Sequence, residues 1–178
     1  MNRRTLVVGS VVMALAPWSK RMVYAKVEPD KRGGLGLTGK EWIKLWGKPD
    51  VTPESGIWKA VYQRWGLQVK LIYLESDQQI ISFDVDPVFQ VSQDRVLPNI
   101  EHFFPDDSQR IDEYPRPTGP GTVLVYNSTW LAERFLALHD PVVSNWFPGG
   151  NPGDFIVILQ ENDAAEVEHV IVALGNNP

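Results

Sequence analysis

Three consecutive segments, at residues 57–63, 67–75 and 79–85, alternate between apolar and polar side chains. In the middle segment one face carries the apolar or aromatic residues Leu67, Val69, Leu71 and Tyr73, and Gln68 and Lys70 begin the other face. Alternation with a period of two is typical of β-strands that bury one face, and short polar turns separate the segments. The sequence therefore predicts a three-stranded antiparallel meander. Its apolar face needs a helix or a second sheet as cover, and this need constrains the fold more than any other feature.

A short helix before the meander can supply that cover. Thr38 can cap its N-terminus, and Glu41 can bond back to the cap, so that the two form a capping box. Gly47 suits a left-handed C-terminal cap, and Pro49 prevents the helix from continuing. Three apolar side chains share one face of this segment: Trp42, Leu45 and Trp46. The pattern predicts a helix at 38–46 that packs its tryptophan face on the sheet.

The second half of the chain repeats this order of elements. The predicted elements are a helix at 93–104 capped by Ser92, strands at 122–126, 155–160 and 167–174, and a short helix that Ser128 caps. Pro/Gly-rich loops are expected at 114–121 and 146–153. We therefore predict one α+β domain at 37–178, made of antiparallel β-meanders packed by short helices. An internal duplication into half-repeats at 37–88 and 89–178 is an open alternative.

Residues 1–25 have the order of an export signal. Arg3 and Arg4 give a positive start, an apolar run follows, and small residues lead to a cleavage site after Ala25. The apolar run is shorter than the roughly 20 residues of a membrane-spanning helix, so we expect a cleaved signal peptide and no membrane span afterwards. An uncleaved anchor is the alternative. Residues 26–36 are expected to form a flexible tether, and the mature chain is expected in the periplasm or outside the cell.

The export route has two interpretations. Residues 2–7, Asn-Arg-Arg-Thr-Leu-Val, resemble the twin-arginine export signal, and Lys20 and Arg21 lie just before the cleavage site. Positive charge there is a feature of that family of signals and hinders the general secretory route. Val8 stands where the family usually has Lys, and paired arginines also occur in ordinary signals. Both routes therefore stay open.

Composition excludes several classes of partner and cofactor. Loss of residues 1–25 removes four basic and no acidic residues, so 13 basic and 22 acidic residues remain, a formal charge of −9. No basic cluster survives, which argues against nucleic acid as a partner. The chain has no cysteine, so disulfides, thiolate metal sites and attached haem are all excluded. We expect no cofactor.

Residues 36–42, Gly-Leu-Thr-Gly-Lys-Glu-Trp, and 45–50, Leu-Trp-Gly-Lys-Pro-Asp, carry a resemblance to a known exported module. This module is shared by the outer-membrane assembly lipoproteins of the SmpA/OmlA type and by β-lactamase inhibitor protein. The resemblance covers residues 36–86. The chain departs from the module in having Trp46 beside the glycine and no lipid-anchoring cysteine. The resemblance implies an α/β module that binds other proteins through its sheet face or loops, and it carries over no catalytic residue.

Aromatic residues in the predicted turns and loops are the candidate binding residues. Trp65 lies in a turn, Trp130 opens a helix, and Trp146 and Phe147 adjoin a Pro/Gly-rich loop. Most aromatic side chains belong to cores, where they dominate the buried area. Aromatic side chains that are exposed among polar residues instead mark binding surfaces.

Asp84 and Asp86 are the candidate metal ligands, because alternation places both carboxylates on one face of a strand. The alternative is that these two aspartates lie at a solvated strand end and bind no metal. No Gly-x-Ser-x-Gly motif is present, and we name no catalytic residue. The leading hypothesis is an exported, non-enzymatic binding domain of the bacterial cell envelope, whose partner is a protein or another envelope component. The alternatives are an exported metal-dependent hydrolase and an accessory protein that binds a small ligand between helix 38–46 and the sheet.

Overall fold

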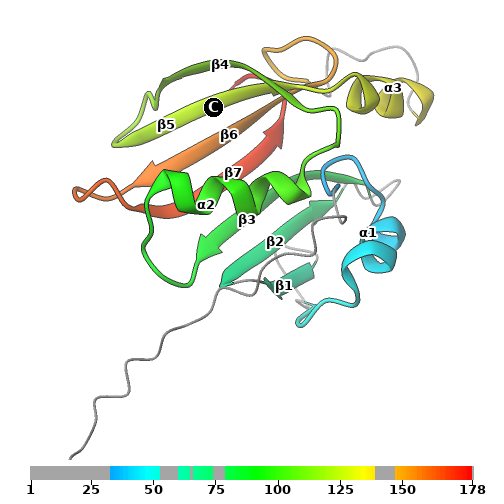
Figure 1. The fold of residues 1–178 in the computed structure, drawn as a ribbon. Coiled ribbons are helices and arrows are strands. Elements are labelled where there is room, and N and C mark those ends of the chain that lie inside the picture. Colours follow the sequence, from blue (N-terminus) through cyan, green and yellow to red (C-terminus); the bar gives the residue numbers. More distant parts are fainter. Residues whose placement is uncertain (1–32, 53–59, 65, 74–78, 139–146, 178) are drawn as a thin grey trace, which may run out of the picture.

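The computed structural model describes residues 33–52, 60–64, 66–73, 79–138 and 147–177, which form an α+β fold with a seven-stranded antiparallel sheet (Figure 1). The strands are β1 (Ala60–Arg64), β2 (Leu67–Tyr73), β3 (Ile80–Pro87), β4 (Gln109–Pro115), β5 (Gly121–Asn127), β6 (Asp154–Glu161) and β7 (Val167–Leu174). The helices are α1 (Gly39–Trp46), α2 (Gln93–Ile100), the 3-10 helix η1 (Glu101–Phe103) and α3 (Thr129–Leu138). The predicted fold class is confirmed.

The strand order is β1-β2-β3-β7-β6-β5-β4, and every neighbouring pair is antiparallel. The last strands of the two halves, β3 and β7, therefore pair at the middle of the sheet, with Phe83 opposite Val172. Of the described strands, three lie on one side of this junction, in the order β1-β2-β3, and four on the other, in the order β7-β6-β5-β4. The internal duplication itself stays a prediction.

Strand β4 was not predicted. The sequence places its first five residues in no element and puts Tyr114 and Pro115 in the loop expected at 114–121. The structure pairs β4 with β5 along the edge of the sheet. All of its side chains except that of Tyr114 are exposed, so the segment has no buried face to produce an alternating pattern. β4 is a strand because it pairs with β5, and no pattern within residues 109–115 indicates that pairing.

The helices and the apolar face of the sheet share one large core. Trp42 is fully buried, and its ring stacks on Phe103 at a centroid distance of 5.4 Å and lies 5.6 Å from the ring of Tyr62. Val96 and Ile100 from α2 join the same core, and α2 lies across the sheet in Figure 1. The prediction that helix 38–46 covers the meander is confirmed. Aromatic rings fill the space between α1 and the sheet where the small-ligand alternative placed its pocket.

Local signals set both ends of α1 as predicted. The Thr38 hydroxyl oxygen accepts a hydrogen bond from the Glu41 backbone N–H at 3.2 Å, and the Glu41 carboxylate accepts one from the Thr38 backbone N–H at 2.8 Å. Gly47 ends the helix with φ of 87°, a value that favours glycine. The capping box and the C-terminal glycine are therefore confirmed.

Residues 33–36, the end of the predicted tether, are packed into the fold and are not a flexible tether. Leu35 is fully buried, and its backbone N–H donates to the Phe103 carbonyl at 3.1 Å. The Gly36 N–H donates to the Ile80 carbonyl at 2.8 Å. A Cβ on Gly36 would lie 2.6 Å from a methyl carbon of Leu131 in α3, so only glycine fits this close approach. Residues 26–32 lie outside the described part of the chain.

The second-half helices differ from the prediction in two details. The helix predicted at 93–104 is α2 followed by η1, and the side chain of Ser92 makes no capping hydrogen bond. Ser128 does cap α3, because its hydroxyl oxygen accepts from the Leu131 N–H at 3.0 Å. The helices in the described part of the chain are too short, or too polar, to span a lipid bilayer.

Candidate functional site

Trp130 is the predicted binding residue that the structure places at the surface. It lies in the first turn of α3, and its side chain is 37% exposed. Its backbone N–H donates to the Asp107 carboxylate at 2.8 Å, and the Ser128 hydroxyl donates to the same carboxylate at 2.5 Å. The loop after η1 therefore holds the start of α3, and with it the position of the Trp130 ring.

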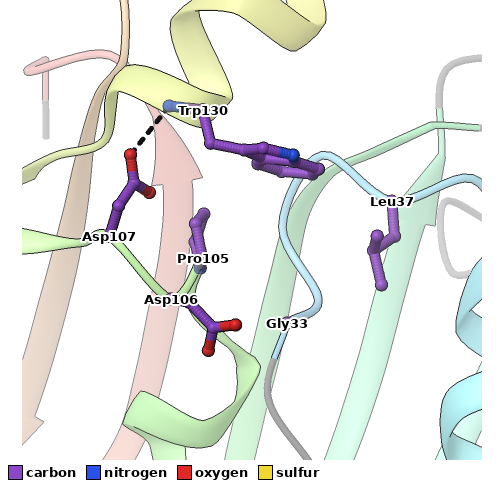
Figure 2. Close-up of a pocket in the computed structure, with 6 residues that line it drawn as sticks. All are labelled: Gly33, Leu37, Pro105, Asp106, Asp107 and Trp130. Atoms are coloured by element: carbon purple, nitrogen blue, oxygen red, sulfur yellow. Dashed lines mark hydrogen bonds between the residues drawn. The ribbon is translucent and has the colours of Figure 1, made fainter.

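The Trp130 ring lies at one side of a pocket of about 360 Å³, drawn in Figure 2. The pocket is lined by Gly33, Leu37, Pro105, Asp106, Asp107 and Trp130. Its apolar surface comes from the indole, the proline ring and the leucine, which belong to three different parts of the chain. A volume near 300 Å³ is at the lower end for ligand pockets and suits one large side chain or a small molecule.

Among the described residues that line the pocket, the charged ones are both aspartates. Asp106 is exposed at its edge, next to Asp107. Partial burial raises the pKa of Asp107, but the hydrogen bonds from Ser128 and from the Trp130 backbone outweigh this effect, so its pKa lies below the usual value. Asp107 is therefore ionised at neutral pH and engaged with α3, whereas Asp106 is free of such contacts among the described residues and available to a cation.

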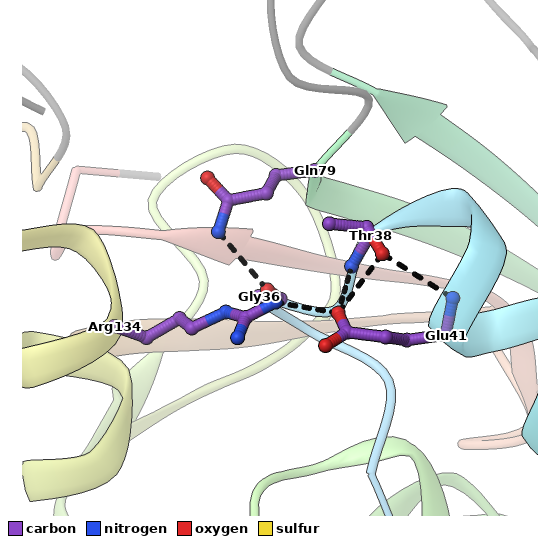
Figure 3. Close-up of polar contacts among 5 residues, drawn as sticks. All are labelled: Gly36, Thr38, Glu41, Gln79 and Arg134. Carbon is purple, nitrogen blue, oxygen red and sulfur yellow. Dashed lines mark hydrogen bonds and ion pairs between the residues drawn. The ribbon is translucent and has the colours of Figure 1, made fainter. Parts of the chain in front are cut away.

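A second contact to the Trp130 ring comes from Arg134 in the same helix. The guanidinium of Arg134 lies 5.7 Å from the ring centroid and also contacts the Glu41 carboxylate at 2.5 Å (Figure 3). Glu41 is the capping-box residue of α1, so one carboxylate links α1, the cap at Thr38 and α3. Burial raises the pKa of Glu41, but its hydrogen bonds to Thr38 and Arg134 lower the pKa by more than burial raises it. The net shift of the pKa is therefore downward.

The segment that carries Leu37 into the pocket is held from the sheet as well. The side-chain amide of Gln79 donates to the Gly36 carbonyl at 3.2 Å, and the Ile80 N–H donates to the Leu37 carbonyl at 2.8 Å (Figure 3). The pocket is thus built from elements that are tied to each other before any ligand arrives. Such preorganisation lowers the entropic cost of binding.

The other predicted binding residues do not join this site. Phe147 is 1% exposed, and its ring packs edge-on against Phe135 at a centroid distance of 5.7 Å, so the prediction that it lies on a binding surface is wrong. The apolar ring of Phe147 packs in the core against Phe135, although the loop next to Phe147 is polar. Trp65 and Trp146 lie outside the described residues.

Asp84 and Asp86 share the sheet face that points away from the helices, where both meet cations. Lys70 forms an ion pair with Asp86. His169 lies between the two acids, with Nδ1 2.5 Å from Asp86 and Nε2 3.3 Å from Asp84. Among the described residues, no group of three His, Cys, Asp or Glu side chains is arranged to hold a metal ion. The geometry gives the metal role of Asp84 and Asp86 no support, and that role stays a prediction.

In the cluster formed by Lys70, Asp84, Asp86 and His169, the charged groups shift the pKa values of His169 and Asp86. The hydrogen bond to Asp84 raises the pKa of His169, burial opposes it, and Asp86 adds to the upward shift. Burial raises the pKa of Asp86, but Lys70 and His169 outweigh it, and the net shift is downward. The cluster is an ion-pair network across β2, β3 and β7, and its members have the ordinary role of neutralising one another on a half-buried sheet face.

Sequence reasoning missed the residues that surround Trp130. Nothing in the local sequence assigns Pro105, Asp106 or Asp107 to a site, and Asp107 is 23 positions from its partner Trp130. Arg134 is 93 positions from Glu41. A run of acids after a helix is a common turn signal, so no local pattern distinguishes a capping aspartate from a solvated one.

Comparison with known proteins gives one structural similarity and no match in sequence. No family model and no curated protein sequence matches this chain. The chain is similar to the crystal structure of a DUF4309 family protein, YjgB, from Bacillus subtilis subsp. subtilis str. 168, with 9% identity and a TM-score of 0.38 over 77% of this chain and 78% of that one. That score carries no argument about function. The resemblance of residues 36–86 to the SmpA/OmlA lipoproteins and β-lactamase inhibitor protein is not shown by these comparisons and stays a prediction.

Proposed function

We propose that this chain is an exported, non-enzymatic binding domain of the bacterial cell envelope, and that its partner is a protein bound at the Trp130 pocket. The observation that carries the proposal is an exposed indole held at the side of an apolar pocket with an acidic edge. Tryptophan at a preformed pocket is the residue type most enriched at the energetic centres of protein interfaces. Export rests on the signal pattern at residues 1–25.

The residues that line the pocket indicate which side chains of the partner would bind there. Leu37, Pro105 and the Trp130 ring offer an apolar surface, and Asp106 offers an unengaged carboxylate at the edge. An apolar side chain next to a lysine or arginine matches both features. The net negative charge of the chain favours the approach of such a basic surface.

The test is capture from the envelope fraction of the source organism with three baits: the wild-type chain, Trp130→Ala and Ile111→Ala. Ile111 is the control, because it is an apolar side chain 55% exposed on edge strand β4 and does not line the pocket. The wild type and the control should retain the same protein saturably. With that protein purified, Trp130→Ala should weaken binding by roughly 30-fold, the effect of losing a hot-spot residue of about 2 kcal/mol.

Stability measurements keep the result interpretable. Trp130 is partly exposed and its interaction with Arg134 is worth only about 0.5–1 kcal/mol, so Trp130→Ala should remain folded by circular dichroism. Asp106→Asn should weaken binding less than Trp130→Ala and should reduce its dependence on salt. Equal capture by the wild type and Trp130→Ala would refute the assignment of the site. A wild-type bait that retains nothing saturably would refute the protein-binding function.

A further inference from the structure

A second pocket lies where the chain leaves β3 and approaches α2, and the described residues that line it all differ from those of the Trp130 pocket. Its volume is about 330 Å³. One wall is the start of β2 with Leu67, a second is the segment from Pro87 to Val91, and the third is the face of α2 that carries Arg95 and Asn99.

The segment that forms the second wall is anchored at both ends. The Val88 N–H donates to the Gly66 carbonyl at 2.7 Å, and the Val91 carbonyl accepts from the Val167 N–H at 2.8 Å. Between these anchors, the side-chain amide of Gln90 donates to the Glu168 carboxylate at 3.3 Å. The pocket is therefore a formed feature of the fold, with its wall held before a ligand binds.

Large apolar side chains remain exposed along this wall. Phe89 is 42% exposed and lines the pocket, and Val88 beside it is 54% exposed. Leu67, Pro87 and Val91 continue the apolar surface into the pocket. Exposed apolar surface that adjoins a concave pocket is typical of a ligand site, since it gains free energy when an apolar ligand removes it from water.

A cation stands at the rim of this apolar pocket. Arg95 and Asn99 are four residues apart in α2 and so lie on one helix face, while Val96 and Ile100 point into the core. Within the described residues no carboxylate pairs with the Arg95 guanidinium, although acidic side chains outnumber basic ones in the chain. A guanidinium binds carboxylates well, because its planar donors match both carboxylate oxygens.

We propose that this pocket binds a small amphipathic carboxylate, with an alkyl chain against Phe89 and Leu67 and the carboxylate on Arg95. A carboxylate is the expected head group because Arg95 is the cation among the described residues that line the pocket, and an alkyl chain is expected because the walls are apolar. The size of the pocket limits the ligand to a short or medium chain. This binding site is independent of the proposed function of the Trp130 pocket.

The test compares three ligands of equal chain length: octanoate, octanol and octylammonium. Each is titrated into the purified chain at neutral pH, and binding is followed by two-dimensional NMR of the backbone amides. Octanoate should bind about fivefold more tightly than octanol, which corresponds to one partly exposed ion pair of about 1 kcal/mol. Octylammonium should bind most weakly, and the shifted amides should be those of residues 87–99.

Variants separate the two parts of the site. Arg95→Gln should remove the preference for octanoate over octanol and leave octanol binding unchanged, whereas Phe89→Ala should weaken both ligands. Arg110→Gln is the matched control, an exposed arginine on β4 paired with Glu113, and should change nothing. The proposal is overturned by an octanoate preference that survives in Arg95→Gln, by equal binding of the three ligands, or by no octanoate binding at millimolar concentration.

Discussion

Replacement of Asp107 by alanine tests how the loop after η1 holds the Trp130 site. The Asp107 carboxylate accepts hydrogen bonds from the Ser128 hydroxyl at 2.5 Å and from the Trp130 backbone N–H at 2.8 Å. It therefore occupies the N-terminus of α3, where the first backbone N–H groups have no partner within the helix. A negative charge there also interacts favourably with the helix dipole.

The magnitude follows from these contacts. Loss of an N-terminal capping side chain costs about 0.5–2 kcal/mol of stability. Asp107 is an exposed residue and Ser128 still caps Leu131 in the variant, so we expect a loss of about 1 kcal/mol, in the middle of that range. In a chain of this length, 1 kcal/mol lowers the midpoint of thermal unfolding by about 2–4 °C.

The assay is thermal and urea unfolding of the wild type, Asp107→Ala and Asp106→Ala, followed by far-UV circular dichroism. Asp106 is the matched control, because it is an adjacent carboxylate at the same pocket with no hydrogen bond to α3. Asp106→Ala should leave the midpoint within about 1 °C of the wild type, since exposed substitutions usually change stability by under 0.5 kcal/mol. Equal midpoints for Asp107→Ala and Asp106→Ala would refute the capping role.

The pH dependence gives an independent check. The pKa of Asp107 is lowered in the folded state, so its contribution is complete above the unfolded value of about 3.9 and is lost as the pH falls further. The stability difference between the wild type and Asp107→Ala should be constant from pH 7 to pH 5 and should narrow below about pH 3.9. A difference that stays unchanged in strong acid would show that the carboxylate charge is irrelevant.

Two further predictions concern the core and the opposite sheet face. Trp42→Ala should destabilise the fold by about 3–5 kcal/mol in urea unfolding, because it empties a fully buried aromatic site, and a loss below about 1 kcal/mol would contradict that packing. Since the pKa of His169 is raised by Asp84 and Asp86 against the effect of burial, its stabilising contribution is complete below about pH 6.5 and is lost as the pH rises through the higher folded value. The stability gap between the wild type and His169→Gln should therefore be larger at pH 6 than at pH 9, and an equal gap would exclude the charged pair with these two acids.

The elements that the sequence predicted best are those whose determinants are close together in the chain. The signals for α1 all lie between Thr38 and Pro49, and the helix, its cap and its terminating glycine were predicted correctly. Strand β7 occupies the predicted residues 167–174, and its last five residues form a continuous apolar run that is typical of a buried strand. Strand β4 was missed because its side chains face water and only its pairing with β5 makes it a strand.

The candidate site was predicted only in part. Trp130 was selected as an aromatic residue and lies at the surface, but the same reasoning selected Phe147, which is buried. Both are aromatic residues in or beside predicted loops, so the local sequence does not separate them. The separation comes from packing, since Phe135 covers Phe147 whereas the Trp130 ring borders an open pocket.

The sequence by itself determined the α+β class, the ends of α1 and the strands with a buried face, since capping, turn chemistry and alternation act over a few residues. Only the tertiary structure decided which side chains meet. Trp130 is held by Asp107, 23 positions away, and Arg134 joins Glu41 across 93 positions. These contacts form because the sheet and its packed helices bring distant segments together, and that arrangement minimises exposed apolar area over the whole chain rather than within any one segment.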